Sequence, residues 1–141
     1  MHITSINKYS DERGVLVFAN QFNTASFQRC YHITHYNSDV VRAWQGHKKE
    51  KKAFWVTKGS FLFQWIAIDR FESANKNLIV SKIKLSFETP KILTLPGGFA
   101  NGFQALEKNS SLMVFSSMTI EKAKEDDYRW EKNYFIKSNW K

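Results

Sequence analysis

In the stretch SFLFQWIAI, residues 60–68, the side chains would alternate between the two sides of an extended chain. Phe61, Phe63, Trp65 and Ala67 fall on one side of an extended chain, and the intervening residues fall on the other. Residues 27–35 (FQRCYHITH) repeat the pattern: Phe27, Arg29, Tyr31, Ile33 and His35 face one way. This period of two predicts β-strands in both stretches.

Further strands are predicted outside these two stretches, at residues 15–22, 53–57, 78–86, 91–95, 102–106 and 112–117. Turn sequences separate them: Asp11-Glu12-Arg13-Gly14, Lys58-Gly59 and Pro96-Gly97-Gly98-Phe99. Helical spacing is weak before Glu121, where a charged stretch predicts a short helix. Many short strands between turns indicate an all-β sandwich or barrel.

The composition limits the class of protein further. The 141 residues suit one domain, 1–141, and the formal charge of +8 suits an anionic partner. A single cysteine, Cys30, excludes a disulfide framework and a multi-thiolate zinc site. The apolar runs are too short to span a membrane, and residues 1–10 lack the apolar core of a secretory signal. We therefore expect a soluble, cytoplasmic protein.

Several short motifs occur in a recognisable order. Asp11-Glu12-Arg13-Gly14 is followed by Arg42-Ala43-Trp44-Gln45, Lys52, Gly59, Asp69-Arg70, and Pro96-Gly97-Gly98-Phe99-Ala100-Asn101-Gly102-Phe103. In this order the chain resembles the dTDP-4-dehydrorhamnose 3,5-epimerases of the cupin superfamily. Arg42 to Lys48 also resembles the Arg-x-x-His-x-His-Lys motif of the dTDP-4-keto-6-deoxyglucose 3,4-ketoisomerases. The resemblance implies a double-stranded β-helix (jelly-roll) barrel with a short helical or irregular C-terminal segment.

The chain departs from the epimerase pattern at its catalytic positions. Gln45 stands where the resemblance places the catalytic base His, and Asn101 replaces a second His. The general-acid Tyr corresponds to Val114 or Phe115. A carboxamide cannot abstract a proton at neutral pH, and neither Val nor Phe can donate one. The usual pair of proton-transfer residues is therefore missing.

His47 corresponds to the second His of the ketoisomerase motif. It lies two residues after Gln45, so both are expected on the same strand face. An imidazole is suited to proton transfer near neutral pH, and Gln45 or Asn101 would donate a hydrogen bond to an enolate oxygen. The alternative is that His47 is only a polar residue near a hairpin. His35 and Tyr31 are the next candidates for the base.

Three cations match the positions that hold the diphosphate in the resembling family: Arg13, Arg42 and Lys52. The metal-ligand positions of other cupins hold Gln45, His47, Lys51 or Lys52, and Asn101. One imidazole beside ammonium groups does not make a cation site, so no metal or other cofactor is expected.

Three functions remain open. The leading hypothesis is a nucleotide-sugar (dTDP-4-keto-6-deoxyhexose) epimerase or ketoisomerase of surface-polysaccharide biosynthesis, an isomerase working through an enolate. The second is a non-catalytic cupin that binds a sugar nucleotide. A small basic nucleic-acid-binding barrel is least favoured, because the lysines do not cluster with aromatic residues on one strand face. The resemblance also implies a homodimer formed by strand exchange, with no nucleic-acid or membrane partner.

Overall fold

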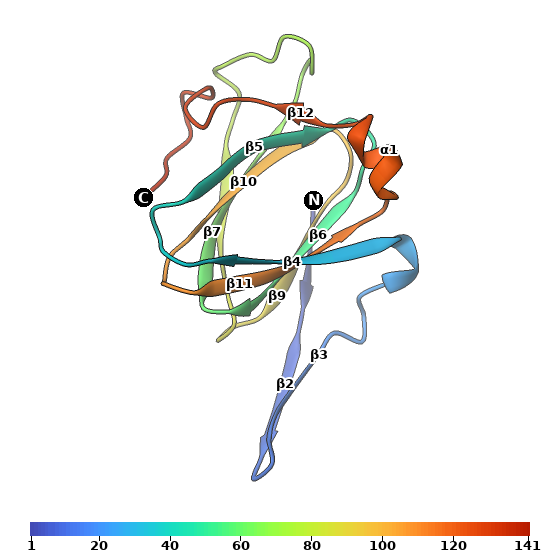
Figure 1. Ribbon diagram of the computed structural model, residues 1–141, viewed down its shortest axis with the longest axis vertical. Helices are drawn as coiled ribbons and strands as arrows, with labels where there is room; N and C mark the ends of the chain where they lie inside the picture. The colour runs from blue at the N-terminus through green and yellow to red at the C-terminus, as the bar shows by residue number, and fades with distance from the viewer.

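The computed structural model describes residues 1–141 and contains two antiparallel five-stranded sheets that face each other (Figure 1). The first sheet has the strand order β1 (His2–Ser5), β9 (Lys91–Leu95), β6 (Lys52–Lys58), β11 (Ser110–Ser116) and β4 (Arg29–His35). The second has the order β12 (Tyr128–Arg129), β5 (Val41–His47), β10 (Phe99–Ala105), β7 (Ser60–Ala67) and β8 (Ser81–Ser86). The prediction of an all-β fold is confirmed.

A separate hairpin extends away from the two sheets at the N-terminal end of the chain (Figure 1). It consists of β2 (Asn7–Asp11) and β3 (Gly14–Phe18), which pair with each other and with no other strand. The turn predicted at residues 11–14 is its tip, where Asp11 lies opposite Gly14. The strand predicted for residues 15–22 ends at Phe18.

The main core lies between the two sheets, because the alternating strands turn their apolar faces toward each other. Phe61, Phe63 and Trp65 of β7 pack there, as their alternation predicts. β6, β9 and β11 supply the opposite side, with Phe54, Val56, Leu93, Leu95, Leu112 and Val114. The predicted turn at Gly59 joins β6 to β7 with a φ of 68°, a conformation that favours glycine.

A second apolar cluster covers the outer face of the β5–β10–β7 sheet. Trp44, Ile66 and Ala100 of the sheet contact Phe135 of the C-terminal segment. A helix, α1 (Ile120–Lys124), and the residues after it cross the end of the barrel, and the helix falls in the predicted charged stretch. No helix in the structure has the length and apolar character that crossing a membrane requires.

Candidate functional site

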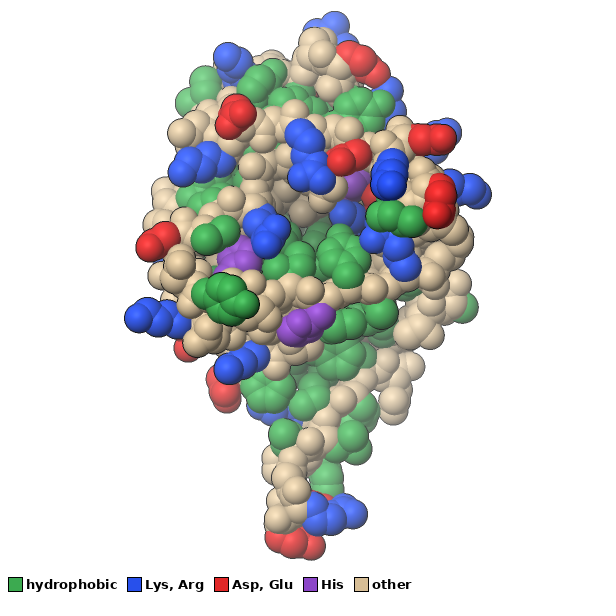
Figure 2. Space-filling view, viewed as in Figure 1, with side chains coloured by type: hydrophobic (Ala, Val, Ile, Leu, Met, Phe, Trp, Pro, Cys, Tyr) green, Lys and Arg blue, Asp and Glu red, His purple; other side chains and the backbone are tan.

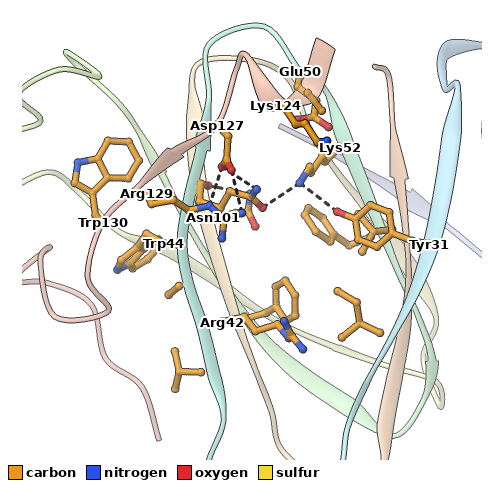
Figure 3. A pocket seen from close by; sticks show the side chains of 18 of the residues that line it. Tyr31, Arg42, Trp44, Glu50, Lys52, Asn101, Lys124, Asp127, Arg129 and Trp130 are labelled. Atoms are coloured by element: carbon orange, nitrogen blue, oxygen red, sulfur yellow. Dashed lines mark hydrogen bonds and ion pairs between the residues drawn. The ribbon is translucent and has the colours of Figure 1, made fainter. Parts of the chain in front are cut away.

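A cavity of about 930 Å³ opens between the sheets, beside the main core. Its apolar floor is formed by Ile33, Phe54, Phe103 and Val114, and α1 and the chain after it form one wall (Figure 3). Five cationic side chains line it, Arg29, Arg42, Lys52, Lys124 and Arg129, against three carboxylates, Glu50, Asp127 and Glu131. Lys and Arg side chains surround the hollow on this face of the molecule (Figure 2). The cavity therefore suits an anionic ligand with an apolar part.

A polar network crosses the cavity from β4 to the C-terminal segment (Figure 3). Lys52, only 4% exposed, donates from Nζ to the Tyr31 hydroxyl (3.2 Å) and to Oε1 of Gln45 (3.1 Å). Nε2 of Gln45 donates to Oδ1 of Asp127 (3.0 Å), which also accepts from Nε of Arg129 (2.8 Å). The amide of Gln45 thus joins a buried ammonium group to a carboxylate.

Asp127 is the carboxylate at the end of this network. Partial burial raises its pKa, but hydrogen bonds from Arg129 and Gln45 outweigh burial and hold the pKa below its ordinary value. The carboxylate is therefore ionised at neutral pH. Sequence reasoning did not single out Asp127, because it lies in a charged stretch that carries no motif.

Arg42 and Gln45 both line the cavity although they are three residues apart on β5. In a regular strand, residues three apart face opposite sides. Here Gln45 pairs with Asn101 and Arg42 with Phe103, so one extra residue of β5 is accommodated at a register shift. Asn101 lies at the same place, and its Nδ2 donates to the main-chain carbonyl of Gln45 (3.3 Å). Two of the predicted cavity residues thus line the cavity on either side of the irregular pairing.

His47 lies outside the cavity lining, so the expectation that it shares the cavity with Gln45 is wrong. The imidazole is 3% exposed, with Nδ1 2.7 Å from the carbonyl oxygen of Asp126 and 2.9 Å from Oε2 of Glu50. The reason is that β5 ends at His47, and residues from the following turn and from the C-terminal segment cover the ring. The His47 side chain therefore does not line the cavity in which its predicted proton-transfer role would operate.

Asp126 fixes the segment that forms the cavity wall. Its carboxylate accepts hydrogen bonds from the main-chain N–H groups of Lys48 (2.7 Å), Lys49 (2.9 Å) and Glu50 (2.8 Å). Charge-assisted hydrogen bonds of this kind are stronger than neutral ones. Asp127 is the next residue, so this anchor also sets the position of the carboxylate in the cavity.

The three predicted phosphate ligands are not brought together within one chain. Arg42 and Lys52 line the cavity, whereas Arg13 is at the tip of the β2–β3 hairpin and does not. The Arg13 side chain is 81% exposed and pairs with Asp11 at 2.6 Å. The prediction placed it by motif alone, and the motif does not reveal that the hairpin projects from the barrel. No group of three or more His, Cys, Asp or Glu side chains is arranged to hold a metal ion.

Comparison with known proteins agrees with this architecture. The family model for dTDP-4-dehydrorhamnose 3,5-epimerase matches residues 1–140. A dTDP sugar isomerase from Desulfovibrio desulfuricans G20 has a TM-score of 0.78 at 18% identity, covering 99% of this chain and 89% of that one. The rmlC epimerase of Mycobacterium tuberculosis has a TM-score of 0.77 at 14% identity, covering 98% and 72%.

A third similar structure is the QdtA 3,4-ketoisomerase of Thermoanaerobacterium thermosaccharolyticum in complex with TDP, with a TM-score of 0.69 at 17% identity, covering 96% and 91%. No curated protein sequence matches this chain significantly. The structural likenesses confirm the predicted cupin fold, and the family model covers nearly the whole chain. The chain therefore belongs to the dTDP-4-dehydrorhamnose 3,5-epimerase family of dTDP-sugar isomerases.

Proposed function

We propose that this protein binds a nucleoside-diphosphate-linked keto-hexose in the barrel cavity and isomerises the sugar, as an epimerase or a ketoisomerase. The observation that carries the proposal is the Lys52–Gln45–Asp127 network, which sets an ammonium group and a carboxylate in the same cavity. Membership of the family supports the same substrate class, and a role in surface-polysaccharide biosynthesis is part of the proposal.

Arg42 and Lys52 are proposed to hold the diphosphate and the sugar. Arg42 lines the cavity, and none of the ion pairs in the structure involves its guanidinium. A guanidinium without a carboxylate partner is available to a phosphate, to which it can donate two parallel hydrogen bonds. Lys52 is almost fully buried and lines the cavity together with its apolar floor, where we place the sugar ring.

The proposed chemistry is proton transfer next to the sugar ketone. Asp127 takes a proton from the carbon beside the carbonyl, the C–H electron pair forms the C=C bond, and the carbonyl π pair moves onto oxygen. Lys52 and the Tyr31 hydroxyl stabilise that enolate oxygen; the hydroxyl accepts from Lys52, so its own hydrogen remains free to donate. A proton delivered from solvent to the opposite face inverts the carbon. The ketone moves instead when the hydroxyl on the deprotonated carbon gives its proton to the enolate oxygen and a proton adds to the former carbonyl carbon.

In this scheme Gln45 and Asn101 are positioning residues. Gln45 holds Lys52 and Asp127 in place, and Asn101 supports the irregular pairing of β5 with β10. The proton-transfer role predicted for His47 stays a prediction, to be tested against Asp127. Two observations favour a second candidate function, a binding protein without catalysis: Gln45 cannot titrate, and His47 does not line the cavity.

Solvent-deuterium exchange separates the two candidates. The protein is incubated in D₂O with dTDP-4-keto-6-deoxyhexoses, and carbon-bound deuterium is located by NMR. We expect exchange beside the ketone, abolished in Lys52→Met and retained in Asp69→Asn, which changes an exposed loop carboxylate. Binding of the sugar nucleotide without exchange in the unmodified protein would establish the binding function instead.

The protein is further proposed to act as a homodimer in which the β2–β3 hairpin meets a second copy. The hairpin exposes Tyr9 (58%), Val15 (50%) and Leu16 (60%), and an isolated two-stranded ribbon is only marginally stable in water. The second copy would cover this apolar ribbon. We propose that in the dimer the hairpin of each copy carries Arg13 toward the cavity of the other copy.

Light scattering tests the assembly. We expect a dimer mass, lost in Leu16→Asp and retained in Ile79→Asp, which changes an even more exposed apolar residue away from the hairpin. Arg13→Ala should weaken dTDP-sugar binding without changing the mass. A monomer at micromolar concentration would contradict the proposal.

A further inference from the structure

His35 and Arg42 form a contact that the proposed chemistry does not use. His35 ends β4, is 2% exposed, and lies between the rings of Phe61 (centroids 5.4 Å apart) and Phe103 (5.7 Å). Its Nε2 is 3.0 Å from Nε of Arg42. The contact therefore joins a buried imidazole to a guanidinium that lines the cavity.

The direction of this hydrogen bond is fixed by the chemistry of the two groups. A guanidinium has five N–H donors and no acceptor, so Nε of Arg42 donates. Nε2 of His35 must then be unprotonated, and the neutral ring carries its hydrogen on Nδ1, a buried atom without a hydrogen-bond partner. Arg42 keeps four N–H donors on its two terminal nitrogens.

The surroundings of His35 contain a single charged group. β7 and β10 present Phe61 and Phe103, β11 presents Ser110 across the strand pairing, and β5 presents Arg42. Burial lowers the pKa of His35, and the positive charge of Arg42 lowers it further. A proton on Nε2 would remove the acceptor and set two positive charges in contact, with no carboxylate to offset them.

We propose that His35 is a positioning residue for Arg42: the neutral imidazole holds the guanidinium toward the cavity, and its protonation releases the guanidinium and weakens anion binding. This inference rests on the proposed function, in which Arg42 binds the diphosphate. It adds a pH dependence below the ordinary pKa of histidine, set by a residue that does not touch the ligand.

Calorimetry with dTDP-glucose between pH 8 and pH 5 tests the proposal, because a diphosphate diester lacks the second phosphate ionisation near pH 6. Because the His35 pKa lies below 6.5, its protonation can reduce the affinity at pH 5 by at most about thirtyfold; losing the hydrogen bonds of one charged group is large enough to give a loss of that order. His35→Gln keeps a neutral acceptor, so its affinity should stay level over this range. The control His32→Gln changes an exposed histidine of β4 and should retain the acid loss.

NMR of the imidazole nitrogens gives a readout that does not depend on the ligand. We expect the Nδ1–H tautomer in the unmodified protein, and a higher His35 pKa with loss of the tautomer preference in Arg42→Met. Unchanged His35 signals in that variant would overturn the inference, as would an equal acid loss in His35→Gln. Absence of dTDP-glucose binding at every pH would instead remove the proposed function, and the NMR result would still decide the His35–Arg42 contact.

Discussion

Replacing Glu50 with Gln tests the buried cluster that holds the turn after β5 against the C-terminal segment. The Glu50 side chain is 1% exposed, and its Oε2 lies 2.9 Å from Nδ1 of His47. Its Oε1 accepts from the Ser116 hydroxyl and from Nη2 of Arg29 (3.3 Å). Glu50→Gln preserves the shape of the side chain and removes its charge, so the variant measures what the charge contributes.

The size of the effect follows from the pKa of Glu50. Burial raises that pKa, but hydrogen bonds from His47 and Ser116 and the charge of Lys52 lower it from 4.5 to about 2. One pKa unit corresponds to about 1.4 kcal/mol, so the ionised form contributes about 3 kcal/mol to the free energy of unfolding. Because the pKa is lower in the folded state, this contribution is present above pH 4.5 and is lost as the pH falls toward 2.

Urea denaturation at pH 7, 5, 4 and 3 provides the assay. We expect Glu50→Gln to be less stable than the unmodified protein by about 3 kcal/mol at pH 7, with the difference shrinking steadily below pH 4.5. Glu88→Gln changes an exposed carboxylate and should follow the unmodified protein throughout. A difference that is the same at pH 7 and pH 3 would refute the reasoning, because the loss would then come from packing and not from charge.

Two further substitutions concern the segment that forms the cavity wall. Asp126→Ala leaves three main-chain N–H groups without their acceptor, so we expect a loss of about 3 kcal/mol or more in urea denaturation; a loss below about 0.5 kcal/mol, the usual surface effect, would contradict the anchoring role. Asp127→Asn should lower turnover about 100- to 10,000-fold with dTDP affinity nearly unchanged, as removal of a general base does. An equal loss confined to His47→Asn, with Asp127→Asn active, would assign the proton transfer to His47.

The strands that the sequence predicts well lie inside their sheets and are rich in buried apolar residues. β9 has the predicted bounds, and β7 ends one residue before the predicted end, because alternation of large apolar residues sets their register. β1 and β2 were not predicted. Residues 2–11 have few apolar side chains, and β1 is a strand because its main chain pairs with β9, from His2 opposite Thr94 to Ser5 opposite Lys91. A contact between segments so far apart leaves no local pattern.

The candidate site divides in the same way. Four of the six predicted site residues line the cavity: Arg42, Gln45, Lys52 and Asn101. The order of the motifs along the chain located these four residues, because that order is the one in which the family's fold places them. Asp127 was missed because its place depends on Asp126 binding the turn after β5, a contact between residues nearly 80 positions apart. Arg13 was placed in the site although it lies on a hairpin whose direction no motif encodes.

The burial of His47 and the presence of Gln45 in the cavity have a common structural basis. The main-chain carbonyl of Asp126 meets the His47 imidazole, while the next residue, Asp127, meets the Gln45 amide. A carboxamide can serve this second contact because it has a donor at one end for Asp127 and an acceptor at the other for Lys52. A neutral imidazole also has one donor and one acceptor, but it would add a titrating group between the two charges. Gln45 cannot titrate, so neither of its two hydrogen bonds is lost through a proton binding to it or leaving it.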